Sequence, residues 1–458
     1  MHILRLNQSQ HATLASHLFD GTGLEAIAVG LCGRSMIEGR SVFVVHRIVE
    51  IPSDECLRAP DRITWPTCRL KALLAEARAN NLAILKIHSH PGGYRQFSSQ
   101  DDASDLDLFN AVGLKVVGEH VSAIMLPDGS IFGRRVGIGG PRGMLDRVSV
   151  VGDDILIWPG RPSLTRADFD VRHRQMFGDH TTESLGSLSV GVVGVSGSGS
   201  PTVEMLVRLG VRRVVLIEPD HVEAKNLNRI YGATRRHAAA EVNKARMMKN
   251  HIDRIGLGTK VEIVEGFADS PEAIARLATC DVLFGCMDSI EGRDTLNRIA
   301  TFYTLPYFDL GVRIDADGSG GVNAVSGVVH YIQPGGSSLR SRGVYSEAEL
   351  HADVLRRTDP DFYEDQVRRG YVRGIVVDRP AVISINTMVA SMAVNELLAR
   401  LHPFRTRPNG DFAIQRISMS HGRIILRPDG EPDANLASHV GRGTTNPPLL
   451  LPRLGRPS

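Results

Sequence analysis

The 458-residue sequence has few cysteines, few aromatic residues and almost no net charge. Its five cysteines form no Cys-x-x-Cys pair, so neither a disulfide framework nor a cysteine-based zinc site is indicated. The formal net charge is +2 and no basic block is present, which argues against nucleic acid as the main partner. No apolar run is long enough to cross a bilayer, and no signal peptide is evident at the start. We therefore expect a cytoplasmic protein without membrane or nucleic-acid partners.

The length predicts more than one domain, because a chain of this size exceeds a single hydrophobic core. High glycine and low aromatic content are typical of α/β domains with many tight turns. We expect a first domain over 1–150 and a second over 160–440. A polar stretch at 161–163 separates them and a helix over 166–177 follows. The end, 441–458, is rich in proline and glycine and is predicted to be a flexible tail.

A pair of histidines follows an apolar segment of the first domain. Residues 82–87 predict a buried strand that leads directly into His88. Residues two apart on a strand face the same side, so His88 and His90 project together and Ser89 points away. Two imidazoles and one carboxylate form a zinc site with a free position for water, and Asp101 is the candidate carboxylate. A His-x-His pair alone is more often structural than metal-binding, so the residues around it decide whether a metal site is predicted.

The pattern continues with Ser98-x-x-Asp101 after a glycine-containing turn. This spacing also fits a capping box at the start of a helix over 101–109. Capping and metal ligation are compatible, because a helix start holds a ligand rigidly.

Together these features resemble the JAMM (MPN+) metalloproteases, which remove ubiquitin or ubiquitin-like proteins from their targets. The resemblance implies that His88, His90 and Asp101 bind zinc. It also implies that Glu25 is the upstream glutamate that takes a proton from water, and that Ser98 hydrogen-bonds the developing oxyanion. The structural alternative for Glu25 is an exposed carboxylate at a strand end.

The second domain opens with the pattern of a Rossmann-type nucleotide site. Glycines in the turn let backbone amides approach a phosphate, and Glu218 stands where an acid accepts hydrogen bonds from ribose. Ser196 occupies a position that the strict dinucleotide motif gives to glycine, and an NAD-dependent oxidoreductase is the alternative. The elements are a strand over 188–193, a turn containing Gly194, Gly197 and Gly199, a helix over 201–209 and a strand over 214–217 that ends in Glu218-Pro219-Asp220.

Charged residues further along favour a triphosphate with magnesium over NAD. Asn226 and Arg229 belong to an Asn-Leu-Asn-Arg motif, and Lys244 lies on a predicted helix. Asp288 ends a predicted buried strand. Taken singly, these residues fit a surface ion pair, a solvated helix face and a turn. Their order along one chain favours ATP.

Residues 165–430 resemble the ThiF/MoeB/ubiquitin-activating superfamily, which adenylates the C-terminal carboxylate of ubiquitin-like proteins. The resemblance implies that Asn226, Arg229 and Lys244 contact ATP phosphates and that Asp288 holds magnesium. Arg174, which precedes Gln175 in the motif of the N-terminal helix, would reach into the ATP site of a partner subunit. The resemblance therefore implies a homodimer.

Two features depart from that family. Many relatives bind a structural zinc through two Cys-x-x-Cys pairs, but Ser338 and Ser341 stand at the first pair's spacing and 433–441 contains no cysteine. We therefore expect no zinc in this domain. No cysteine follows Cys286, which is expected within a buried strand, so no thioester cysteine is present. Either the adenylate passes directly to an external acceptor, or Ser338 or Ser341 carries an oxyester, which would need an adjacent base.

We expect an α/β protein, with a JAMM-type mixed α/β domain followed by a Rossmann-like adenylation domain. The predicted function is bifunctional: a zinc peptidase and an ATP- and Mg²⁺-dependent activating enzyme of a bacterial ubiquitin-like pathway, with a conjugating enzyme as a further partner. Activation of a sulfur-carrier protein is the alternative pathway. A non-catalytic interaction protein is a third hypothesis, which the intact acids, histidines and lysine disfavour. The identity of the ubiquitin-like protein, and whether the peptidase matures or deconjugates it, stay open.

Overall fold

A nine-stranded mixed sheet organises the N-terminal part of this computed structural model, which describes residues 1–160, 168–317, 319–369 and 380–455. Its strand order is β11-β10-β1-β3-β2-β6-β7-β8-β9. The strands are β1 (His2–Asn7), β2 (Ile27–Ile37), β3 (Arg40–Glu50), β6 (Ala83–Ser89), β7 (His120–Met125), β8 (Ile131–Gly137), β9 (Gly140–Met144), β10 (Arg147–Val151) and β11 (Ile155–Pro159). A small separate hairpin consists of β4 (Leu57–Ala59) and β5 (Arg62–Thr64).

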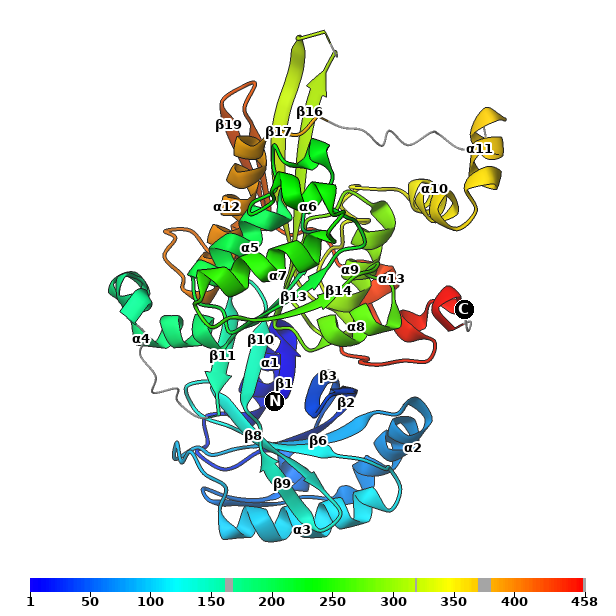
Figure 1. Ribbon diagram of the computed structural model, residues 1–458. Coiled ribbons are helices and arrows are strands. Elements are labelled where there is room, and N and C mark those ends of the chain that lie inside the picture. Colours follow the sequence, from blue (N-terminus) through cyan, green and yellow to red (C-terminus); the bar gives the residue numbers. More distant parts are fainter. Residues whose placement is uncertain (161–167, 318, 370–379, 456–458) are drawn as a thin grey trace. The chain divides into compact units, whose positions relative to one another are not determined.

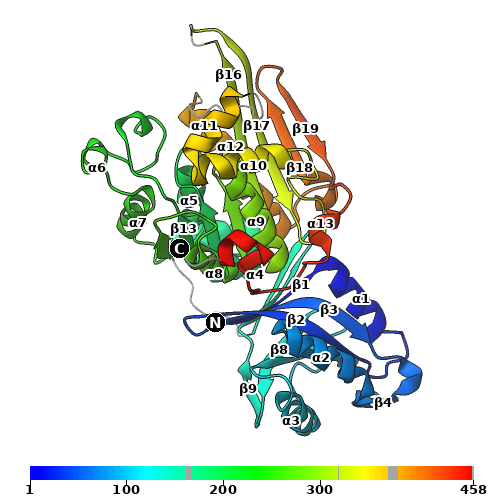
Figure 2. The same cartoon turned by 90° about the vertical axis from the view of Figure 1, so that its right-hand side faces the viewer.

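Helices cover both faces of this sheet, so its central strands are buried on both sides (Figures 1 and 2). Alternate residues of β6 enter different cores, with Leu85 and Ile87 on one face and Ile84 on the other. The first face is covered by α1 (Gln8–Leu18), and the second by α2 (Leu70–Asn80) and α3 (Ser99–Gly113). All residues of β6 are buried, which gives the histidine pair a rigid base.

The C-terminal residues belong to this first unit, which comprises Met1–Leu164, Thr301–Thr304 and Ser438–Ser458. The expected first domain ended at 150 and the expected flexible tail covered 441–458, whereas this unit extends beyond 150 and includes the described residues of the tail. The Gly33 N–H donates to the Gly441 carbonyl at 3.1 Å, and the Thr444 N–H donates to the Arg34 carbonyl at 2.9 Å.

The reason for this difference is the close approach of two backbones. A Cβ on Gly33 would lie 2.3 Å from the Arg442 carbonyl carbon, and Gly441 and Gly443 adopt φ values of +71° and +65°. The glycines that suggested mobility in the sequence are therefore required for packing against β2.

The second unit, Thr165–Ala300 with Leu305–Ala437, is built on an eight-stranded sheet of order β14-β13-β12-β15-β16-β17-β18-β19. The strands β14, β13, β12, β15 and β16 are parallel to one another. The sheet continues with β17, β18 and β19, each of which is antiparallel to the strand before it. The strands are β12 (Ser189–Val193), β13 (Arg213–Ile217), β14 (Lys260–Val264), β15 (Val282–Gly285), β16 (Tyr307–Ala316), β17 (Val322–Ile332), β18 (Ile414–Ser418) and β19 (Arg423–Arg427).

Helices connect the parallel strands, as in a Rossmann-like fold. These are α5 (Gly199–Arg208), α6 (Arg235–Ala239), α7 (Lys244–Ile255), α8 (Pro271–Ala278) and α9 (Ile290–Phe302). Helix α4 (Val171–Ser187) precedes β12, and α10 (Glu347–Thr358), α11 (Pro360–Arg368), α12 (Ile383–Leu401) and α13 (Ala434–Ala437) follow β17. Residues 166 and 167 of the first expected helix lie outside the described residues. The described part continues past its expected end to Ser187, with a kink at Gly178.

None of the helices in the described residues is both long and apolar enough to cross a membrane. Both units show the mixed α/β architecture expected from the sequence.

Candidate active sites

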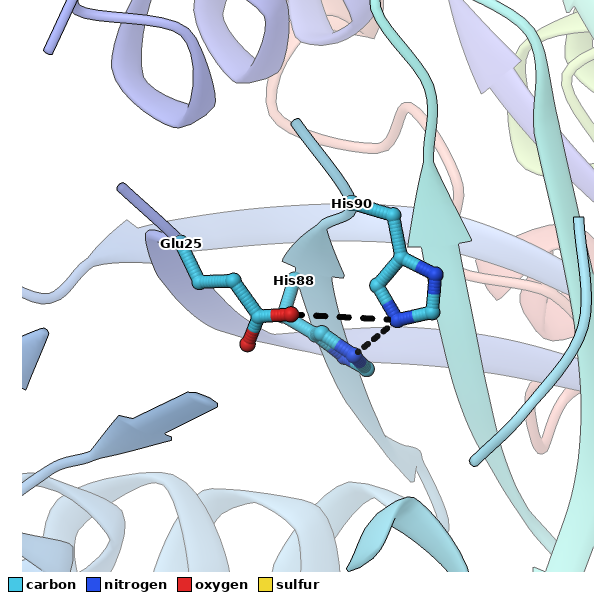
Figure 3. A group of neighbouring side chains, drawn as sticks. All are labelled: Glu25, His88 and His90. Carbon is cyan, nitrogen blue, oxygen red and sulfur yellow. Dashed lines mark hydrogen bonds and ion pairs between the residues drawn. The ribbon is translucent and has the colours of Figure 1, made fainter. Parts of the chain in front are cut away.

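His88 and His90 point to the same side at the end of β6 (Figure 3). Their Nε2 atoms lie 3.3 Å apart. Backbone pairing fixes the segment: the His90 N–H donates to the Met125 carbonyl at 3.1 Å, and the Ala26 N–H donates to Ser89 Oγ at 2.9 Å. Ser89 is thus used for backbone hydrogen bonding, which leaves the two imidazoles facing one point.

Two carboxylates approach the histidines. Asp101 lies 3.0 Å from His88 Nε2 through Oδ1 and 3.6 Å from His90 Nε2 through Oδ2. Glu25 lies 3.9 Å from His90 Nε2 through Oε1 (Figure 3). Glu25, His88 and His90 also place one donor atom each within 4.8 Å of one another. Because Asp101 reaches both imidazoles, it is better placed than Glu25 to be the third ligand.

Asp101 is held by the predicted capping box at the start of α3. The Ser98 N–H and hydroxyl donate to Asp101 Oδ2 at 2.7 and 2.8 Å, and the Asp101 N–H donates to Ser98 Oγ at 3.1 Å. The Ser98 proton is therefore directed to Asp101 in this structure. Its predicted role at an oxyanion needs that proton to turn toward the substrate.

Burial and charge set the protonation of these groups. Burial raises the pKa of Glu25 to about 7 and lowers the pKa of His88. Burial also opposes a charged His90, but hydrogen bonds to Asp101 and the Tyr94 carbonyl outweigh it and raise that pKa. Hydrogen bonds from both histidines overcome the burial of Asp101 and lower its pKa. A donor set of two imidazole nitrogens and one ionised carboxylate around a common point fits zinc.

The position of Glu25 depends on Arg58, a residue that the sequence gave no reason to select. The Arg58 guanidinium donates to the Glu25 carbonyl at 2.7 Å and to the Leu24 carbonyl at 3.1 Å, and it pairs with Asp20 at 2.7 Å. The Glu25 N–H donates to the Ala59 carbonyl at 2.9 Å. The β4–β5 hairpin therefore fixes the backbone on both sides of the Glu25 side chain.

A buried charge network fixes α3, which carries Asp101. Asp105 is fully buried and accepts from Lys86 at 2.7 Å and from Arg134 at 2.7 and 2.9 Å. Lys86 belongs to β6 and Arg134 to β8, so one carboxylate ties the helix to two strands. Residues 82–87 were predicted to form a buried strand because they are mostly apolar, and this pattern did not indicate that Lys86 belongs to a charge network.

The glycine-rich turn of the second unit follows β12 directly. Gly194 has a φ of +87°, and a Cβ there would lie 2.8 Å from the Cys286 carbonyl group. A Cβ on Gly199 would lie 1.9 Å from the Gly194 carbonyl oxygen. Gly197 packs against Arg229 and Asn386, where a Cβ would lie 3.4 Å and 2.3 Å from their side chains. Asn386, on α12, is a neighbour of this turn that no sequence pattern indicated.

Acidic and basic residues gather at the carboxyl end of β13. Glu218 is buried and accepts from the Val195 N–H at 2.6 Å and the Asp220 N–H at 3.0 Å. Burial raises the pKa of Glu218. Lys244 begins α7 and pairs with Asp220 at 2.9 Å. The carboxylate of Glu218 thus supports the glycine turn in addition to its predicted contact with ribose.

The remaining predicted ATP contacts differ in how accessible they are. The side-chain oxygen of Asn226 accepts from the Glu223 N–H at 3.0 Å, so this buried amide caps its own turn. Arg229 donates to the Lys225 carbonyl at 2.8 Å. Asp288 is exposed and follows Cys286 and Met287, which pack against Gly194. Cys286 lies just after β15, outside the strand expected to contain it.

Arg174 has partners within its own helix region. It pairs with Asp170 at 2.9 Å and with Asp179 at 2.7 Å. These pairs do not require a second subunit, and the homodimer stays a prediction.

Ser338 and Ser341 lie in a hydrogen-bonded cluster at the position of the missing cysteines. Ser338 Oγ donates to Asp433 Oδ2 at 2.6 Å, and both side chains are buried. The Ser338 N–H donates to Ser341 Oγ at 2.9 Å, and the Asp433 N–H donates to the Gly336 carbonyl at 3.1 Å. A potential base is therefore present, which the sequence did not show. The 2% exposure of Ser338 favours a structural role over an oxyester.

Comparison with known proteins identifies both parts. The ThiF family matches residues 171–425, which is more than half of the chain. The chain belongs to the ThiF family. The family described as "Prokaryotic homologs of the JAB domain" matches residues 7–133, so this ThiF protein carries a JAB domain ahead of its ThiF region. The predicted fusion is confirmed, and the NAD-dependent alternative loses its support.

Individual relatives cover only part of the chain. It is 32% identical to ubiquitin-like modifier-activating enzyme 5 of Culex quinquefasciatus over 33% of this chain and 39% of that protein. The Drosophila melanogaster protein of the same name is 32% identical over 32% of this chain and 37% of that protein. The chain thus spans about two-fifths of the length of these relatives. A crystal structure of E. coli MccB with MccA-N7isoASN covers 62% of this chain and 77% of that chain, at 15% identity and a TM-score of 0.45.

Proposed function

We propose that this ThiF protein is a bifunctional enzyme of a ubiquitin-like protein pathway. Its JAB unit would free the C-terminus of a ubiquitin-like protein, and its ThiF unit would adenylate that C-terminus. The observation that carries the proposal is the convergence of His88, His90 and Asp101, with buried Glu25 beside them, in a chain that belongs to the ThiF family.

In the JAB unit, His88, His90 and Asp101 would hold zinc. When bound, zinc supplies Lewis-acid polarisation of an amide carbonyl and lowers the pKa of water. Glu25 would accept the proton of the attacking water at Oε1 and pass it to the leaving amine. Arg58 keeps Glu25 in place, because it holds two consecutive backbone carbonyls. Ser98 would hydrogen-bond the oxyanion after its hydroxyl turns from Asp101.

In the ThiF unit, amides of the turn at 194–199 would cradle the triphosphate of ATP. The substrate carboxylate would attack the α-phosphorus, so an O–P bond forms, the α–β phosphoanhydride breaks and pyrophosphate leaves. Lys244 and Arg229 would stabilise the charge that develops on the leaving pyrophosphate. Asp288 would hold Mg²⁺, since its exposed carboxylate follows the residues that pack on Gly194.

The test is ATP–pyrophosphate exchange by the purified full chain with Mg²⁺ and ubiquitin-like proteins encoded near its gene. We expect exchange that depends on a free C-terminal carboxylate and is abolished by Asp288→Ala. Asp361→Ala, an exposed acid on α11, is the matched control and should retain exchange. Absence of exchange with every such protein would refute the adenylation half. Formation of a thiocarboxylate in place of a protein conjugate would assign the chain to sulfur-carrier activation.

A further inference from the structure

A pocket of about 290 Å³ lies on one face of β16, β17 and β18 in the ThiF unit. Strand register explains its lining. Arg313 pairs with Ser326, and Arg416 pairs with Val328, which in turn pairs with Gly311. Directly opposed residues on antiparallel strands face the same side, as do residues two apart. These side chains therefore project into one space, while α12 packs on the other face against Gly327.

The floor of this pocket is made of small residues. Gly311 has no side chain, and a Cβ there would lie 2.9 Å from Val328 Cγ1. Ser326 and Val328 complete the centre of the lining. A floor of this kind leaves room for an extended backbone to lie along the strands.

The rim of the pocket carries unneutralised positive charge. Arg293 is matched by the buried Asp309 at 3.1 Å. Within the described residues, the exposed guanidinium groups of Arg313 and Arg416 have neither an ion pair nor a side-chain hydrogen bond. Burial, and then the guanidinium groups of Arg342, Arg293 and Arg416, lower the pKa of His330 to about 3, so this residue adds no charge to the pocket. The pocket therefore suits an anion.

The pocket is close to the proposed adenylation centre. Asp309 on β16 is in register with Gly285 at the end of β15, and β15 lies beside β12, which leads into the glycine turn. Arg293 also interacts electrostatically with Asp288. Neighbouring strands are about 4.8 Å apart, so β16 is about 10 Å from β12. Arg313 lies four residues beyond Asp309, about 13 Å further along β16, and Arg416 lies two strands beyond β16, so both are about 17–20 Å from the end of β12. An extended peptide covers that distance in about five or six residues.

We propose that Arg313 and Arg416 bind an acidic side chain of the substrate's C-terminal tail, about five residues before the terminal carboxylate. This inference rests on the proposed adenylation function and narrows its substrate class. The acid would be held by charge-assisted hydrogen bonds while the terminal carboxylate lies at the α-phosphate. The pocket would thereby select among ubiquitin-like tails that share a terminal glycine.

The test uses two fluorescein-labelled octapeptides that end in Gly-Gly and carry Glu or Gln as the fifth residue from the end. Binding to the full chain is measured by fluorescence anisotropy with a non-hydrolysable ATP analogue present. We expect the Glu peptide to bind about tenfold more tightly, as a charged hydrogen bond predicts. The preference should disappear in the double variant Arg313→Gln/Arg416→Gln. It should persist in Arg423→Gln, an exposed arginine on β19 that does not line the pocket.

Three results overturn the proposal. The first is equal affinity for the two peptides, including no measurable binding of either. The second is an unchanged preference in the double variant. The third is a double variant that loses affinity for pyrophosphate while the peptides remain indistinguishable, which would assign the pocket to phosphate. Failure of the proposed function has a different signature, because no carboxylate substrate would then support ATP–pyrophosphate exchange.

Discussion

The Oδ1 atom of Asp101 lies 3.0 Å from His88 Nε2, and Oδ2 of the same carboxylate lies 3.6 Å from His90 Nε2. Glu25, in contrast, comes within 4.0 Å of His90 alone, at 3.9 Å, and its carboxylate lies within 4.8 Å of His88. One carboxylate thus contacts both imidazoles and the other lies to one side. Asp101 is therefore placed to bind the metal as a ligand, and Glu25 is placed to act as the base.

Asp101→Ala should weaken zinc binding by more than about 100-fold, because losing a ligand costs more than losing an outer-shell partner. Glu25→Gln should keep the affinity of the native chain. The measurement is competition with a chelator, followed by metal analysis of the dialysed protein. A Glu25→Gln variant that lost zinc as completely as Asp101→Ala would make Glu25 a ligand and remove it as the base.

Arg58→Ala should lower the kcat of the peptidase about tenfold and leave KM and zinc content unchanged. The reason is that Arg58 holds the Glu25 carbonyl at 2.7 Å and the Leu24 carbonyl at 3.1 Å. Steady-state cleavage of a ubiquitin-like fusion measures this effect. Arg62→Ala, in the same hairpin and exposed, should behave as the native chain. Loss of zinc in Arg58→Ala would indicate collapse of the site instead of a shifted base.

Asp105→Ala should destabilise the first unit by about 3–5 kcal/mol, because Lys86 would be left buried without a counterion and Arg134 would keep only Asp102. The two tryptophans of the chain, Trp65 and Trp158, both lie in this unit, so urea unfolding followed by tryptophan fluorescence reports on it. Asp107→Ala, exposed on the same helix, should change the free energy of unfolding by less than about 0.5 kcal/mol. Equal effects of the two substitutions would contradict the role of the network.

Ser338→Ala should lower the stability of the ThiF unit by about 1–3 kcal/mol, since buried Asp433 would lose its hydroxyl donor. The zinc content of the full chain should stay at that of the JAB site alone. Hydrogen exchange of α13 and metal analysis of the same sample test both parts. A second zinc that disappears in Ser338→Ala or Asp433→Ala would show that this cluster binds metal.

The sequence predicted those parts of the sites that depend on local geometry. The common direction of His88 and His90 follows from the two-residue repeat of a strand, and the Ser98–Asp101 box follows from helix capping. The turn from Gly194 to Gly199 is equally local, because its glycines are needed within six residues of chain.

Contacts between distant segments were not predictable from local patterns. Ser338 meets Asp433 across 95 positions, and Arg58 reaches Glu25 from a hairpin without a motif. The close packing of residues 441–443 was not predicted for a related reason. Glycine signals either mobility or close packing, and the partner that decides between them, Gly33, lies about 400 residues away.

The central claim is that two active sites act in sequence on one C-terminal tail. Its most direct test is ATP–pyrophosphate exchange with a ubiquitin-like protein whose terminal glycine is blocked by an added peptide. The zinc-loaded native chain should first cleave the block and then show exchange. Glu25→Gln should give no exchange with the blocked protein but full exchange with the unblocked one, and Asp288→Ala should cleave the block without exchange. Equal exchange by the native and Glu25→Gln chains with the blocked protein would contradict the account.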